Sequence, residues 1–193
     1  MSIDGLELAV IPLDAPEAQD PNLTGAKAAH LARAAVAGLP VLPGFVLVPA
    51  QRAPKAPAGQ KAMRRAWQAL AGAHGSARAV VVRSSSVYED TEYSSMAGRF
   101  ESVLDARGWK EFTTAVRTVL DSARQVRPLR QSPSTLPGDG MAVLVQPMLT
   151  SAVGGVMFGA DPVEGVPTAS WSARYAAALT SWSTAALKEC ATS

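Results

Sequence analysis

The feature that most constrains the fold is a run of four apolar residues, Ala79 to Val82, which is followed at once by Arg83. Three of the four are valine, and β-branched side chains in an unbroken run are typical of a strand that is covered on both faces of its sheet. The run therefore predicts a buried strand. An arginine cannot lose its charge and is costly to bury alone, so Arg83 needs an anionic partner where this strand ends.

Two kinds of partner are open to Arg83. The first is a carboxylate of the chain itself, and three acidic residues follow closely: Glu89, Asp90 and Glu92. The second is the phosphate of a ligand, which the loop expected after Arg83 favours. Ala97-Gly98 permits close approach of the backbone, and serine hydroxyls are abundant there. These serines are Ser84, Ser85, Ser86, Ser94 and Ser95.

Composition and charge exclude several classes of function. The chain has 193 residues, and 18 basic against 16 acidic residues leave a formal charge of +2, so no strong field favours nucleic acid or anionic membranes. With one cysteine, Cys190, and two histidines, His30 and His74, we expect no intramolecular disulfide and no metal site. The first residues lack the basic region of an export signal, and no apolar stretch reaches about 18 residues. We therefore expect a cytoplasmic protein without membrane contact.

Hydrophobic periodicity predicts an α+β fold with mixed or antiparallel sheets flanked by helices. Thr24 is expected to cap the first helix and Gly38 to end it. The strands at 141–146 and 154–158 are expected to form a hairpin or to lie side by side. Expected helices cover 25–37, 61–73 and 109–126, and further strands cover 6–13, 45–48 and 100–104. Trp67 and Phe112 are expected at core positions from their helical spacing, and Val36 is a further core candidate.

Two further positions suggest ligand contacts, each beside a plainer alternative. Lys27 lies in the first turn of a predicted helix, where positive charge opposes the helix dipole unless the amine has an anionic target. The alternative is a solvated surface lysine. The strand that ends at Gln146 precedes Met148 and has an apolar wall, which suits a purine whose edge needs a donor and an acceptor. The alternative there is an ordinary core hairpin.

Three segments, in this order, resemble the nucleotide-binding domain of the phosphoenolpyruvate synthase and pyruvate phosphate dikinase family. They are GAKAAHLARAAVAGLPVLPGFVL, AVVVRSSSVYEDTEYSSMAGRFESVL and MAVLVQPMLTSAVGGVMFGADPVEG, and the resemblance covers Asn22 to Gly165. It implies a partial ATP-grasp-like domain that binds ATP and Mg²⁺ between two lobes. It also implies a kinase-type transferase, in which the phosphoryl group passes to a histidine on another domain or chain and on to pyruvate.

The resemblance also assigns roles to residues. Lys27 is similar to the family's phosphate-contacting lysine, and Arg83 to its phosphate-clamping arginine, the candidate catalytic residue. Gly98 would lie in the loop that closes over the phosphates, while Gln146 and Met148 would lie near the adenine. The family's metal-holding acidic residues and its Gln-x-Arg motif lie downstream of ADPVEG and have no counterpart here. The resemblance therefore implies a catalytically incomplete portion, with no metal ligands of its own.

Two domains are expected: 1–165, the N-terminal part of the ATP-binding domain, and 166–193, an atypical tail. The tail is rich in alanine, serine and threonine, and it is either the end of a truncated or frameshifted product or an Ala-rich helix over 173–187. Other functions are a rifamycin- or glucan-phosphorylating relative, or a non-catalytic remnant or docking module. A nucleic-acid module ranks third, because the arginines lack interleaved aromatic residues.

Overall fold

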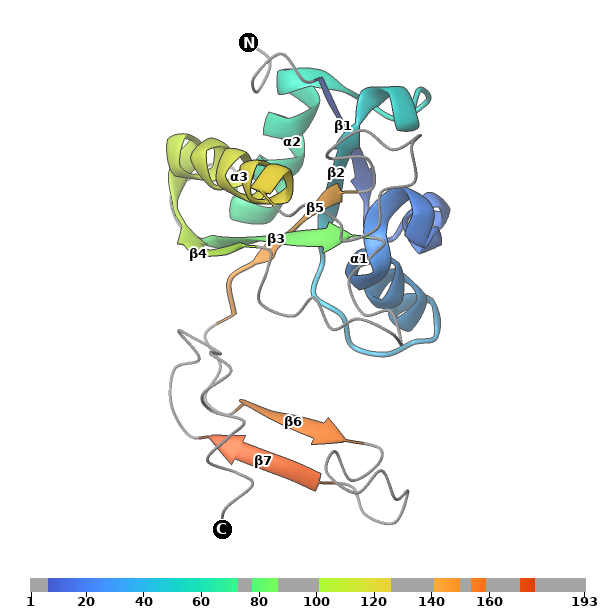
Figure 1. Cartoon of the computed structure of the whole chain (residues 1–193), viewed down its shortest axis with the longest axis vertical. Coiled ribbons are helices and arrows are strands. Elements are labelled where there is room, and N and C mark those ends of the chain that lie inside the picture. Colours follow the sequence, from blue (N-terminus) through green and yellow to red (C-terminus); the bar gives the residue numbers. More distant parts are fainter. Residues whose placement is uncertain are drawn as a thin grey trace. The chain divides into compact units, whose positions relative to one another are not determined.

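The computed structural model describes residues 7–72, 78–86, 101–125, 141–149, 154–158 and 171–175. The chain divides into two compact units, 1–148 and 149–193. In the first unit, five strands form one antiparallel sheet in the order β1-β2-β5-β3-β4 (Figure 1). The strands are β1 (Leu8–Pro12), β2 (Phe45–Pro49), β3 (Val80–Ser86), β4 (Ser102–Ala106) and β5 (Met141–Pro147).

Helices cover both faces of this sheet, as the valine run predicts. Helices α2 (Gly59–Ala71) and α3 (Gly108–Gln125) pack on one face, and α1 (Pro21–Val36) packs on the other (Figure 1). Two short 3-10 helices, η1 (Pro16–Gln19) and η2 (Ala50–Arg52), lie in the connections. The α+β prediction is thus confirmed, and the five-stranded sheet is antiparallel throughout.

The larger side chains gather on the face under α2 and α3. Val80 and Val82 point to this face because side chains alternate along a strand, and both are fully buried. Trp67 of α2 stacks on Phe112 of α3, with ring centroids 6.1 Å apart. Both aromatic residues were expected at core positions from their helical spacing, and that prediction is confirmed.

Small side chains fill the face under α1. Ala28 and Ala32 are buried against Val46 and Leu144 of the sheet, and alanine lets the helix backbone approach closely. The prediction that Val36 belongs to the core is wrong, since its side chain is 68% exposed at the end of the helix. The helix therefore contributes mainly alanines from its middle to the core of this layer.

The start of α1 differs from the prediction. The helix begins at Pro21, and the side chain of Asp20 accepts a hydrogen bond from the Asn22 N–H at 2.9 Å. Thr24 does not cap the helix: its hydroxyl donates to the Ala18 carbonyl at 2.8 Å and to the Asp20 carbonyl at 2.9 Å. Both carbonyls lie within six residues of Thr24, and its hydroxyl reaches them because the helix begins before Thr24 and not after it.

The serines after Arg83 belong to the strand and not to a loop. Ser84, Ser85 and Ser86 continue β3 and pair with Val143, Ala142 and Met141 of β5. All three serines are buried. A serine favours loops when its hydroxyl competes for local backbone groups, and pairing with β5 removes that competition. The next predicted strand is also displaced, since β4 covers 102–106 where 100–104 was expected.

The second unit contains an antiparallel pair of strands, β6 (Gly154–Phe158) and β7 (Trp171–Tyr175). The predicted pairing of 141–146 with 154–158 is wrong, because β5 pairs with β2 and β3, and β6 pairs with β7. Strand β7 also occupies the start of the segment for which a helix over 173–187 was considered.

Candidate functional site

The candidate site is built around an interruption in α1 at Gly25. This residue has φ 79° and ψ 164°, a backbone conformation that only glycine adopts without strain. A Cβ atom at Gly25 would lie closer than 3.0 Å to the carbonyl group of Ser85 on β3. Glycine therefore permits two things at this position, a left-handed backbone and direct contact between the helix and the strand.

Ser85 is joined to the helical turn that follows Gly25. Its Oγ accepts a hydrogen bond from the Ala28 N–H at 3.1 Å, and its side chain is fully buried. This bond fixes the turn that carries Lys27 against the C-terminal end of β3. The sequence suggested that the Ser85 hydroxyl could face a ligand, whereas in the structure this hydroxyl is occupied by the helix.

Arg83 lies two residues before Ser85 on the same strand. Since side chains alternate along a strand, Arg83 faces the α1 side of the sheet, as Ser85 does. It pairs with Leu144 of β5, and its side chain is half-buried. Its expected carboxylate partners, Glu89, Asp90 and Glu92, lie outside the described residues. The structure thus assigns Lys27 and Arg83 to the same side of the sheet.

Gln146 lies further along this face, and Met148 follows the strand end. The Gln146 Nε2–H donates to the Leu42 carbonyl at 3.0 Å, so its side chain anchors the connection between α1 and β2. The Met148 N–H donates to the Ala79 carbonyl at 2.8 Å. Both groups therefore have protein partners, and their role beside an adenine stays a prediction.

The spacing along β3 relates these two regions. Gln146 pairs with Val81, two residues before Arg83, which corresponds to about 7 Å along an extended strand. Arg83 and Gln146 are therefore close neighbours on this face of the sheet.

The predictions on the phosphate loop, metal ligands and membrane helices are only partly covered by the described residues. Gly98 lies outside the described residues. In the described ranges, no group of three or more His, Cys, Asp or Glu side chains is placed to hold a metal ion. Of the helices in these same ranges, none combines the length and the apolar character needed to cross a membrane.

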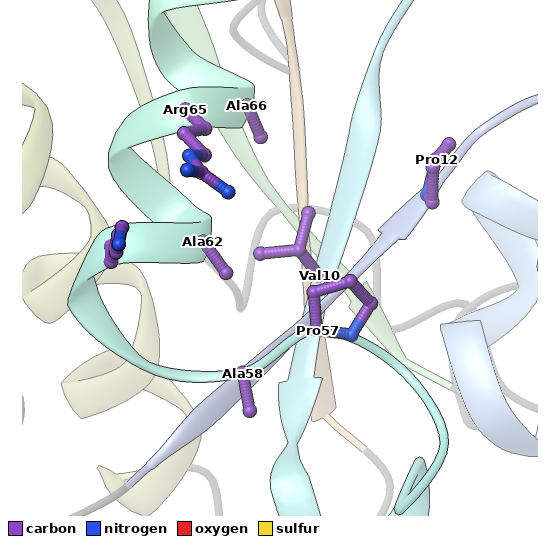
Figure 2. Close-up of a pocket in the computed structure, with 8 residues that line it drawn as sticks. Val10, Pro12, Pro57, Ala58, Ala62, Arg65 and Ala66 are labelled. Carbon is purple, nitrogen blue, oxygen red and sulfur yellow. The ribbon is translucent and has the colours of Figure 1, made fainter.

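A pocket of about 460 Å³ lies elsewhere, between β1 and the start of α2 (Figure 2). Val10 forms part of its wall and belongs to the core cluster under α2 and α3. The pocket is thus on the opposite face of the sheet from Ser85. It does not coincide with the predicted site. Its other lining residues are Pro12, Pro57, Ala58, Lys61, Ala62, Arg65 and Ala66.

Sequence reasoning missed the contact between Gly25 and Ser85. A glycine directly before the helical turn that carries Lys27 was a signal that the backbone there needs a special conformation or a close approach. Nothing in the sequence indicated which residue approaches it, because Ser85 is separated from Ala28 by 57 positions. The strand partner became evident only with the sheet assembled.

Sequence comparison relates this chain to known proteins. Residues 51–175, more than half of the chain, match the family described as pyruvate phosphate dikinase, AMP/ATP-binding domain. A phosphoenolpyruvate synthase from Aeropyrum pernix is 38% identical over 89 residues, which are 45% of this chain and 11% of that protein. The prodigiosin synthesizing transferase PigC from Serratia marcescens is 27% identical over 183 residues, 81% of this chain and 20% of that protein.

The chain spans only a fifth or less of the length of these relatives. The family match covers the segment from η2 through β7, which includes Arg83, Gln146 and Met148. The chain therefore belongs to the pyruvate phosphate dikinase AMP/ATP-binding domain family.

Proposed function

We propose that the chain is the ATP-binding portion of a dikinase-type phosphotransferase with an ATP-grasp-like domain. The observation that carries the proposal is the placement of Lys27 and Arg83 on one side of the sheet, with the turn that carries Lys27 bonded to Ser85. Membership of the family supports ATP as the ligand, and the two cationic side chains suit its phosphates.

The proposed reaction requires the protein to position the phosphates and to stabilise their charge. Phosphoryl transfer needs little covalent help from the protein, so catalysis depends on holding the phosphates and stabilising their charge. The Arg83 guanidinium can donate two parallel hydrogen bonds to phosphate oxygens, while the Lys27 ammonium acts as a compact charge. The adenine would lie toward Gln146 and Met148, and Gly98 would belong to the loop over the phosphates.

Magnesium is expected with ATP in this family, and the described residues show no preformed cluster of ligands for it. They contain no group of three carboxylate, imidazole or thiolate side chains that could hold the ion. Lys27 and Arg83 are the cationic groups proposed to neutralise the phosphates.

The phosphoryl acceptor would be a histidine on a downstream domain or a separate chain, and then pyruvate. The similarity to phosphoenolpyruvate synthase supports this order of transfer. A second candidate is a transferase that makes a natural product, because the prodigiosin synthesizing transferase aligns with 81% of this chain. Both candidates require the same ATP site.

Calorimetric titration with a non-hydrolysable ATP analogue tests the shared site. Arg83→Ala should weaken binding by at least about tenfold, since hydrogen bonds to charged groups contribute about 1.5–3 kcal/mol each. Lys27→Ala should weaken it less, because a single point charge is removed. Arg107→Ala is the matched control: Arg107 is exposed, and its guanidinium pairs with Asp105 at 2.8 Å.

The outcomes separate the alternatives. Saturable binding that Arg83→Ala weakens and Arg107→Ala leaves unchanged supports the proposal. Equal affinities for wild type and Arg83→Ala would show that Arg83 is satisfied within the protein. If a folded chain binds no nucleotide, the proposal is wrong for this chain, and a docking module or remnant becomes the better interpretation.

A further inference from the structure

The turn that carries Lys27 has no capping side chain of its own. The first N–H groups of a helical segment lack intrahelical partners, and a side chain at the residue before the segment usually accepts from one of them. After the interruption in α1, that residue is Gly25, which has no side chain. Ala28, three residues later, is in the position where the capped N–H normally lies.

Ser85 supplies the missing acceptor from another element. Its Oγ lies 3.1 Å from the Ala28 nitrogen, and both residues are fully buried. The absence of a Cβ at Gly25 is what lets the strand come this close. The hydrogen bond therefore forms in a dry junction, where losing the acceptor would leave a buried N–H without its partner.

We propose that Ser85 is a positioning residue, whose hydroxyl caps the turn after Gly25 and thereby holds Lys27 on the side of the sheet that Arg83 faces. This inference rests on the proposed nucleotide site and adds a residue that does not itself touch the nucleotide. Lys27 is adjacent to the capped residue, so release of the Ala28 N–H changes the backbone from which the lysine extends. Arg83 is positioned independently, by the pairing of β3 with β5.

Ser85→Ala tests the proposal, and Ser122→Ala is its matched control. Ser122 is also a buried serine, and its Oγ accepts from the Glu101 N–H at 3.3 Å and donates to the Val119 carbonyl at 2.7 Å. It lies on α3, on the other face of the sheet. Both variants lose a buried hydroxyl, but only Ser85→Ala releases the turn beside Lys27.

The first measurement uses no nucleotide. Amide hydrogen exchange and backbone chemical shifts, followed by NMR, should show faster exchange at Ala28 and shifted signals around Lys27 in Ser85→Ala and not in Ser122→Ala. Ser85→Thr, which keeps the hydroxyl, should resemble wild type more closely than Ser85→Ala does. If Ser85→Ala leaves exchange at Ala28 unchanged, the capping role is overturned whether or not the chain binds nucleotide.

The second measurement is the affinity for the ATP analogue. Ser85→Ala should weaken binding about three- to tenfold, a range typical of one lost hydrogen bond, while Ser122→Ala should leave it unchanged. The double variant Lys27→Ala with Ser85→Ala should bind no more weakly than Lys27→Ala alone, because Ser85 acts through the lysine.

An additive loss in the double variant would show that Ser85 acts on binding by another route, which overturns the positioning role. Unchanged affinity in Ser85→Ala beside faster exchange at Ala28 would overturn it as well. Absence of nucleotide binding by wild type contradicts the proposed function instead. In that case the hydrogen-exchange measurement at Ala28 tests the capping role of Ser85 by itself. The failures of the two proposals are therefore distinguishable.

Discussion

Replacing Gly25 with alanine should destabilise the fold strongly, and the structure separates two causes. The first is conformational: φ 79° with ψ 164° belongs to a region that essentially only glycine occupies, and such strain costs about 1–3 kcal/mol. The second is steric. The new Cβ would overlap the carbonyl oxygen and carbon of Ser85, and overpacking of this kind costs about 1–3 kcal/mol. Together they predict a loss of about 2–6 kcal/mol in the free energy of unfolding.

The steric part is hard to relieve because the overlapping atoms are backbone. Ser85 pairs with Ala142 of β5, so its carbonyl cannot move without disturbing the pairing of β3 with β5. Removal of the serine side chain in the double variant Gly25→Ala with Ser85→Gly should therefore recover little of the lost stability. This distinguishes backbone overlap from a clash with the hydroxyl.

Urea unfolding of Gly25→Ala beside Gly38→Ala measures the difference. Gly38 has the same φ of 79°, but a Cβ there would meet no atom within 4 Å. Gly38→Ala should thus cost only the conformational amount of about 1–2 kcal/mol. If the two variants lose equal stability, the close approach of Ser85 is not what requires glycine at position 25, and the reasoning on this junction is refuted.

Two further perturbations test the core and the connection beside the site. Phe112→Ala should lower the free energy of unfolding by about 3–5 kcal/mol, because this fully buried ring contacts Phe45, Trp67 and Trp109. Urea denaturation followed by tryptophan fluorescence measures this loss. A loss under about 1 kcal/mol would contradict the assignment of Phe112 to the core. Gln146→Leu should lower the free energy of unfolding by about 1 kcal/mol, because it removes the hydrogen bond to the Leu42 carbonyl. Limited proteolysis should then cut the connection at 37–44 faster than in wild type. An unchanged cleavage rate would show that this bond does not hold the connection.

Much of the architecture could be predicted from local pattern. The valine run predicted a strand covered on both faces, and Val80 and Val82 are buried under two helices while α1 covers the other side. The helical spacing of Trp67 and Phe112 predicted core positions, which the structure confirms. These predictions succeed because burial of one face imposes its period on the sequence wherever the element lies in the fold.

The errors have two physical causes. Thr24 looked like a helix cap, but the helix begins earlier, at Pro21, and the Thr24 hydroxyl donates to the Ala18 and Asp20 carbonyls, six and four residues before it. The serines after Arg83 looked like a loop, but β5 supplies their backbone partners. Local propensity cannot decide between two ways of satisfying a polar group when one of them requires a remote strand.

The candidate site shows the same division. The sequence by itself determined which cations to consider, because a lysine in a first helical turn and an arginine after an apolar strand both need an explanation in terms of charge. Only the tertiary structure decided that Lys27 and Arg83 belong to one side of the sheet. That side is set by the alternation of β3 and by the Ser85–Ala28 hydrogen bond, which closes only when Gly25 lets helix and strand touch.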